Sequence, residues 1–149
     1  MCMCRIKSIV EKIIEKYGTN DPFKIAEQQN IIVQFEDLKE IYGFYNYFKR
    51  IKFIHINCNI DFFYQKYCCA HELGHANLHH DINTPFLKKY TLYSTDKIEV
   101  EANRFAVELL MPDKLLYENT SKFDPLTIYE SGQLYGVPKE FVRLKKMSI

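Results

Sequence analysis

Histidine occurs only five times in this chain of 149 residues, and four of the five lie between positions 71 and 80. The first two, His71 and His75, are four residues apart. In a helix, residues four apart lie on one face, about 6 Å apart along the axis. We therefore expect this segment to be a helix in which two imidazoles point in the same direction and can converge on one metal ion.

The residues around these two histidines fit zinc-dependent hydrolysis, because His-Glu-x-x-His is the pattern of zinc metalloproteases. Zinc lowers the pKa of bound water to about 7. Glu72 follows His71 directly but is rotated away from the metal. It can therefore take the proton of that water as hydroxide attacks a carbonyl, and then pass it to the leaving amine. The sequence predicts zinc (Zn2+) as the cofactor and Glu72 as the catalytic residue.

The same pattern also arises by chance, in which case the segment is an ordinary helix with one histidine satisfied in the core. Gly74 lies between the two histidines. Glycine inside a helix costs about 1 kcal/mol relative to alanine. Its presence here indicates that something, for example another backbone, packs closely against this face.

A catalytic zinc site needs a third protein ligand and an open position. No third histidine follows His75 at the spacing that metzincins use. A glutamate from a second helix is the other solution, and we assign Glu99, on a helix predicted at residues 95–110. Asn103 shares its face and could hydrogen-bond a ligating histidine. Glu101 is the alternative ligand, but we expect it to face solvent. The predicted metal ligands are thus His71, His75 and Glu99.

Apolar periodicity and turn residues predict an α+β fold in a single domain over residues 1–149. It has a small three-stranded antiparallel or mixed sheet packed on the active-site helix, with additional helices at both ends. Further helices are expected at residues 6–17, ended by Gly18, and from Asp21-Pro22 to Asn30. Asp61 can cap the active-site helix, which we expect at residues 61–80. Strands are expected at residues 31–35, 42–48 and 51–56.

Several finer features follow from single residues. Lys49-Arg50 is predicted to form a tight hairpin turn. The last strand is not clearly polar on either face, so we expect both faces to be covered. The tyrosines at residues 42–47 lie on a strand that could pair with an extended substrate, and one of them could stabilise an oxyanion. Three prolines are each placed to open a short helix: Pro112, Pro125 and Pro138.

The composition of the chain limits the cellular compartment and the binding partners that we expect for it. Five cysteines form no evident disulfide framework, and neither a secretory signal nor a membrane-spanning run is present, so we expect a cytoplasmic protein. The net charge is +1 with no block of like charge. We therefore expect neither a membrane partner nor direct nucleic-acid binding.

Two segments together resemble the ImmA/IrrE family of metallopeptidases: A-H-E-L-G-H-A-N-L-H-H at residues 70–80 and E-V-E-A-N-R-F-A-V-E-L-L-M-P at residues 99–112. Residues 134–144 resemble the family's C-terminal helical segment, so the resemblance spans roughly residues 5–146. Pro138 stands where a small polar residue is common. The resemblance implies a zincin-like, minimal gluzincin fold. It also implies cleavage of a helix-turn-helix repressor encoded on a mobile element or prophage.

Two other functions remain open at this point. The protein could be an anti-repressor or toxin-system component that binds and sequesters a DNA-binding partner without hydrolysis. The zinc could also be purely structural, which requires a fourth protein ligand, and His79 is the nearest candidate. The simpler interpretation of His79 and His80 is that they end the helix and interact favourably with its dipole.

Overall fold

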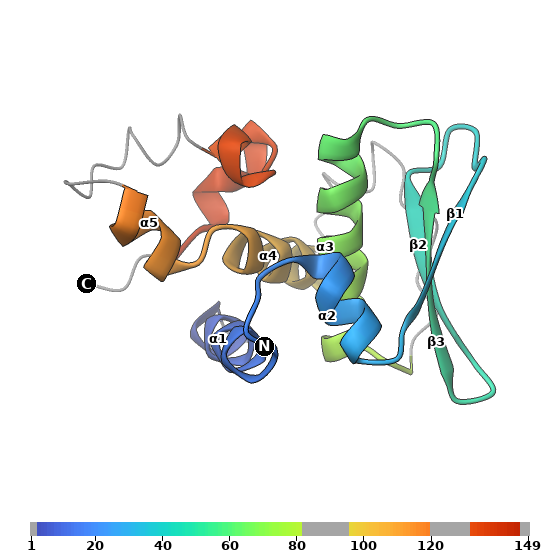
Figure 1. The fold of residues 1–149 in the computed structure, drawn as a ribbon, viewed down its shortest axis with the longest axis horizontal. Coiled ribbons are helices and arrows are strands. Elements are labelled where there is room, and N and C mark those ends of the chain that lie inside the picture. Colours follow the sequence, from blue (N-terminus) through green and yellow to red (C-terminus); the bar gives the residue numbers. More distant parts are fainter. Residues whose placement is uncertain (1–2, 82–95, 120–131, 147–149) are drawn as a thin grey trace.

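The computed structural model describes residues 3–81, 96–119 and 132–146, and in these ranges the fold is α+β (Figure 1). The expected loop at Thr84-Pro85 and the helix expected to begin at Pro125 lie outside these ranges. The elements are α1 (Met3–Tyr17), α2 (Pro22–Gln28), β1 (Ile32–Glu36), β2 (Gly43–Phe48), β3 (Ile51–Asn57), α3 (Phe62–Leu78), α4 (Lys97–Leu110), α5 (Asp113–Asn119), and two short 3-10 helices, η2 (Gly132–Tyr135) and η3 (Lys139–Leu144).

Helix α1 ends and helix α2 begins at the expected residues, whereas α1 begins three residues earlier than expected and α2 ends two residues earlier, at Gln28. Helix α1 ends at Gly18, which has a φ of +69°, a conformation that glycine adopts at little cost. Helix α2 starts after Asp21, whose carboxylate accepts a hydrogen bond of 2.9 Å from the backbone N–H of Phe23. Asn30, which follows α2, is left-handed at φ 60° and turns the chain into β1.

The sheet is mixed, with the strand order β1-β3-β2. Strand β3 pairs parallel to β1 and antiparallel to β2. The turn between β2 and β3 is the predicted hairpin, and Lys49 and Arg50 both have positive φ, at 50° and 65°. Two positive φ values are those of the type I′ turn, whose twist matches that of paired strands. The local geometry therefore forms without the usual Asn or Gly.

The two faces of the sheet differ in exposure. Ile54, Ile56 and Tyr45 are buried on the face that packs against α3. On the other face, Phe48 is 61% exposed and Ile51 is 44% exposed. The prediction that β3 is covered on both faces is therefore wrong at its hairpin end.

Helix α3 is the centre of the molecule, with the sheet on one side and α1 and α4 on the other, while α2 lies alongside it (Figure 1). Asp61 occupies its N-cap position, but the side chain makes no capping hydrogen bond, contrary to the expectation. Every residue from Tyr67 to Ala76 is buried. A helix buried on all sides is normally apolar, so the polar residues within this stretch must find partners inside the protein.

Helix α4 packs across α3 at Gly74. A Cβ atom on Gly74 would lie 3.2 Å from Cα of Ala102 and 3.1 Å from Cβ of Phe105. The expectation that another backbone lies close to this glycine is confirmed. The close approach brings the first turns of α4 against the last turns of α3.

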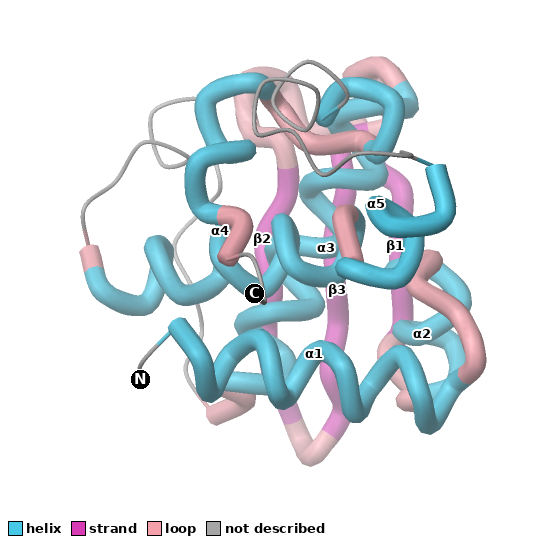
Figure 2. The backbone as a smooth tube through the Cα atoms, turned by 90° about the vertical axis from the view of Figure 1, so that its left-hand side faces the viewer, coloured by secondary structure: helices cyan, strands magenta, loops and turns pink. Residues whose placement is uncertain are grey.

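The C-terminal elements pack on the side of the helices away from the sheet. Pro112 directly precedes α5 and Pro138 caps η3, as the sequence predicts. Viewed from the helical side, the three strands lie behind the helices, with α1 running across them (Figure 2). Among the described residues, no helix is both long and apolar enough to cross a membrane.

Candidate metal centre

Three side chains converge where α3 and α4 cross. Nε2 of His71 lies 2.9 Å from one carboxylate oxygen of Glu99, and Nε2 of His75 lies 3.1 Å from the other. All three residues are buried, at 2% exposure or less. Within the described ranges, these three are the group of His, Cys, Asp or Glu residues that could hold a metal ion.

The spacing of these atoms fits a small tetrahedral metal ion. With metal–ligand bonds of about 2.0–2.1 Å, tetrahedral ligand atoms lie about 3.3 Å apart. Nε2 of His75 and Oε1 of Glu99 approach that separation, yet within the described part of the chain neither has a hydrogen-bond partner. Buried polar atoms are rarely left unsatisfied. A metal ion between them would satisfy both, so the residues fit the metal that the motif implies.

The protonation of these groups suits metal binding. Burial lowers the pKa of His75 to about 4, so its ring is neutral near pH 7. Burial alone would raise the pKa of Glu99, but the adjacent rings of His71 and His75 outweigh it and lower the pKa to about 2. Burial also lowers the pKa of His71, and here the neighbouring carboxylates Glu99 and Glu72 reverse the effect, so the net shift is upward. Because a bound cation would replace the proton that these carboxylates favour, the site is electrostatically prepared for one.

Asn103 orients His71, as expected from its position on the face of Glu99. Its side-chain oxygen lies 2.9 Å from Nδ1 of His71 and accepts a 2.8 Å hydrogen bond from the hydroxyl of Tyr67. A carbonyl oxygen only accepts hydrogen bonds, so Nδ1 of His71 donates to it, and Nε2, which faces Glu99, is the nitrogen left for a metal ion. Sequence reasoning does not single out Tyr67, although it lies four residues before His71, on the same helix face.

Glu72 is buried at 1% exposure beside the cluster. Its charge reaches His71, since it is one of the groups that raise the pKa of that imidazole. Glu72 does not belong to the three-residue cluster itself. Its place is therefore next to the centre and outside the ligand set.

One sequence-based expectation about a neighbouring residue is wrong. Glu101 is predicted to face solvent, but it is 5% exposed and its Oε1 lies 3.2 Å from Nε2 of His79. The reason is that more than one face of the first turns of α4 is covered, as the burial of Glu99, Ala102 and Asn103 also shows.

His79 does end α3, but it is buried and does more than face the helix dipole. Its Nδ1 lies 3.1 Å from Nδ1 of His75, on the side of that ring away from Glu99. His79 is therefore badly placed to be a fourth ligand. His80, in contrast, is exposed.

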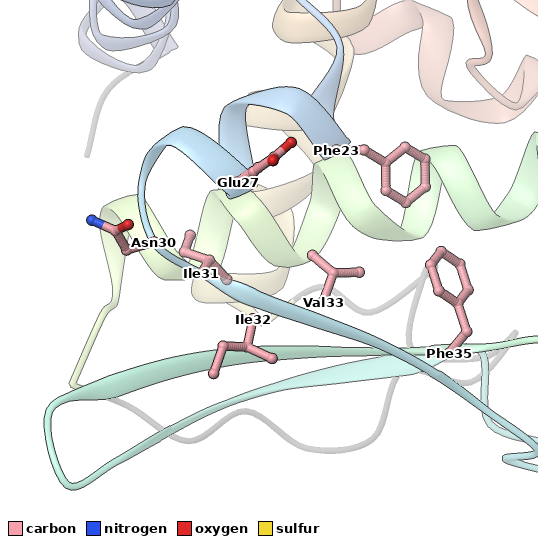
Figure 3. A pocket seen from close by; sticks show the side chains of 7 residues that line it. All are labelled: Phe23, Glu27, Asn30, Ile31, Ile32, Val33 and Phe35. Atoms are coloured by element: carbon pink, nitrogen blue, oxygen red, sulfur yellow. The ribbon is translucent and has the colours of Figure 1, made fainter.

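The tyrosine-bearing strand β2 is an edge strand. The hydroxyl of Tyr45 donates a 2.6 Å hydrogen bond to the backbone oxygen of His80, which ties β2 to the end of α3. On the opposite edge of the sheet, a hollow of about 560 Å³ lies between α2 and β1 (Figure 3). Its lining includes Phe23, Glu27 and Phe35 and none of the residues of the metal cluster.

Comparisons with known proteins agree with this geometry. Residues 26–146 match the peptidase family described as the IrrE N-terminal-like domain. The chain is 46% identical over 146 residues to "Uncharacterized immunity region protein 2" of Bacillus phage phi105, covering 96% of this chain and 90% of that protein. It is 33% identical over 145 residues to "Metallopeptidase ImmA" of Bacillus subtilis (strain 168), covering 96% of this chain and 84% of that protein.

The match covers both helices that form the cluster, and it runs from α2 through η3. The relatives are aligned over nearly their whole length rather than over a shared motif alone. The convergence of two histidines and a glutamate is what a metallopeptidase of this kind requires. The chain belongs to the IrrE N-terminal-like family of peptidases.

Proposed function

We propose that this protein is a zinc-dependent endopeptidase in which His71, His75 and Glu99 hold the metal and Glu72 is the general base. The observation that carries the proposal is the position of Glu99. Its two oxygens face Nε2 of both histidines at 2.9 and 3.1 Å, across an interface between two helices that are separate in sequence. With three protein ligands, a fourth position is left for water or substrate, as catalytic zinc sites require.

A zinc ion in this place would supply a Lewis acid that polarises the scissile carbonyl and makes a neighbouring water more acidic. Glu72 follows His71 on α3 and is buried beside the cluster. Its carboxylate accepts the proton of the attacking water and then delivers it to the leaving amine. Throughout this cycle Asn103 keeps His71 in the tautomer whose Nε2 carries no proton and can hold the metal.

The proposed substrate is a helix-turn-helix repressor, and the proposed role is that of an anti-repressor on a mobile element or prophage. Support comes from the relatives, since one is named as a phage immunity-region protein and another as a metallopeptidase. We place the activity in the cytoplasm, where thiols stay reduced. The four cysteines within the described ranges are free: Cys4, Cys58, Cys68 and Cys69.

The test is to mix the purified zinc-loaded protein with the repressor encoded beside its gene and to follow cleavage by mass spectrometry. Wild type should cut at a defined site, and a chelator should stop it. Glu72→Gln should bind zinc as wild type does but cleave at least about 10²-fold more slowly, because a general base contributes 10²–10⁴-fold.

Two outcomes would contradict the proposal. Cleavage by Glu72→Gln at the wild-type rate would remove Glu72 from the mechanism. An intact repressor in a stable complex, with or without chelator, would indicate a non-hydrolytic anti-repressor that acts by sequestration.

A further inference from the structure

His79 is a buried residue at the C-terminal end of α3, and both of its ring nitrogens have partners. Its Nδ1 lies 3.1 Å from Nδ1 of His75, and its Nε2 lies 3.2 Å from Oε1 of Glu101. The centroids of the two imidazole rings are 5.3 Å apart. Glu101, His79 and His75 thus form one continuous chain of hydrogen bonds that ends on a proposed zinc ligand.

The chemistry of this chain determines which nitrogen carries each proton. An ionised carboxylate only accepts hydrogen bonds, so Nε2 of His79 must donate to Glu101. A neutral imidazole protonated on Nε2 has its lone pair on Nδ1. Nδ1 of His75 must therefore donate to His79. With the proposed metal ion between His75 and Glu99, the lone pair of His75 is then on Nε2, the nitrogen that faces Glu99.

We propose that His79 and Glu101 are positioning residues, which hold His75 in the tautomer and ring orientation that present Nε2 to the metal. The inference rests on the proposed metal centre, because it explains how one of its ligands is prepared. Groups that hydrogen-bond the second nitrogen of a metal-binding histidine fix its tautomer and raise its basicity.

The two histidines of the metal centre are then oriented by different hydrogen-bonding groups. For His71 a single amide oxygen, that of Asn103, accepts the Nδ1 proton directly. For His75 the acceptor is another histidine, which a carboxylate in turn orients. Glu99 and Glu101, two residues apart on α4, therefore act on the two opposite nitrogens of the His75 ring, one directly and one through His79.

The test compares substitutions that keep or remove the hydrogen bonds at position 79. His79→Leu fills a similar volume but can neither donate nor accept. His79→Gln has an oxygen that can accept from His75 and an amide that can donate to Glu101. Glu101→Leu removes the far end of the chain. His80→Leu is the matched control, because His80 is exposed and only its backbone oxygen holds Tyr45.

Two measurements are needed, and neither depends on a substrate. Zinc affinity is measured by competition with a chelator, and the hydrogen bond from Nδ1–H of His75 is followed in the zinc-loaded protein by the protection of that proton from exchange with water. His79→Leu and Glu101→Leu should bind zinc about 10- to 100-fold more weakly. In both variants, the Nδ1 proton of His75 should exchange faster than in wild type. His79→Gln should recover most of the affinity, and His80→Leu should match wild type.

Three results would overturn the inference. One is wild-type zinc affinity in His79→Leu together with unchanged protection of the Nδ1 proton of His75. Another is a loss in His79→Gln as large as in His79→Leu, which would mean that the ring matters only for packing. The third is a zinc-loaded wild type in which the Nδ1 proton of His75 exchanges as fast as in His79→Leu. If wild type binds no zinc at all, the proposed metal centre itself fails, an outcome distinct from variants that bind zinc as tightly as a zinc-binding wild type.

Discussion

Asn103 shows how one side chain can serve both the fold and the chemistry. Its oxygen receives two hydrogen bonds inside the protein, one from the hydroxyl of Tyr67 and one from the ring of His71. Burial raises the pKa of Tyr67 well above its usual value, so the hydroxyl stays protonated and can donate. Two donors on one carbonyl leave little freedom for the amide to rotate, and the ring of His71 is fixed with it.

We expect Asn103→Leu to weaken zinc binding by about 10- to 100-fold, because the acceptor that orients His71 is lost. Tyr67→Phe is the matched comparison, since it removes one donor and leaves the bond between His71 and Asn103 in place. Its effect on zinc affinity should be clearly smaller. Competition titration with a chelator measures the zinc affinity of both variants. Equal affinities for Asn103→Leu and wild type would show that Asn103 does not support metal binding.

At the scale of elements, the centre depends on how closely α3 and α4 approach. Gly74 is the point of contact, and the nearest atoms of α4 are Cβ and Cδ1 of Phe105 and Cα of Ala102. The Cα and Cβ atoms can move only if the helix moves. Because Glu99 comes from α4 and both histidines come from α3, separation of the two helices would change the distances within the metal cluster.

Gly74→Ala therefore tests this contact through the direction in which it changes the stability of the fold. Helix propensity alone would make alanine about 1 kcal/mol more stable than glycine. We expect the opposite, a lower melting temperature, together with weaker zinc binding, and larger losses for Gly74→Val. Thermal unfolding with and without zinc measures both effects. A raised melting temperature with unchanged zinc affinity would show that α4 tolerates a side chain here.

The sequence predicts the faces of these helices better than their relative placement. Spacing alone puts Glu99 and Asn103 on one face, because four residues make about one helical turn. For Glu101 the sequence-based expectation is wrong, and for His79 it is incomplete, because the burial of the other faces depends on the angle at which α4 crosses α3. That angle results from side-chain packing between segments distant in sequence, which periodicity does not contain.

The sheet shows the same limit. The local pattern around Lys49-Arg50 predicts the hairpin of β2 and β3, and the hairpin is present. The parallel pairing of β1 with β3 brings together strands that are not consecutive in the chain, and the sequence leaves the sheet as antiparallel or mixed. Local turns are encoded locally, whereas strand order depends on long-range burial against α3.

At the scale of the whole molecule, a buried group of charges joins the two ends of the described chain. Asp113 at the start of α5 lies 2.9 Å from Nζ of Lys7 on α1 and 2.7 Å from Nζ of Lys145, which follows η3. Lys145 also contacts Glu108 on α4 at 2.8 Å. Burial alone raises the pKa of Asp113, but hydrogen bonds from Lys145 and Lys7 outweigh it, and the pKa is lowered.

This shift predicts an acid-sensitive fold. Because the folded-state pKa of Asp113 lies below the unfolded value of about 3.9, its carboxylate stabilises the fold above that pH. The contribution is lost as pH falls through the folded pKa. We expect Asp113→Asn to lower the free energy of unfolding at pH 7 by about 2 kcal/mol. Its stability should also fall less steeply than that of wild type below about pH 4.

Urea unfolding of the metal-free protein at several pH values measures this effect. Glu118→Gln is the control, because Glu118 lies on the same helix and is exposed. Parallel stability curves for wild type and Asp113→Asn across this range would show that the charged group does not contribute to the acid sensitivity.

The histidines along α3 are regularly spaced, with three residues between His71 and His75 and three between His75 and His79. Each residue inserted into a helix rotates the remainder of that helix by about 100°. One extra residue between His75 and His79 would therefore rotate His79 away from Glu101, although every side chain of the centre would still be present. Insertions and deletions within this stretch should be tolerated far less than substitutions, since the number of intervening residues matters more than their identity.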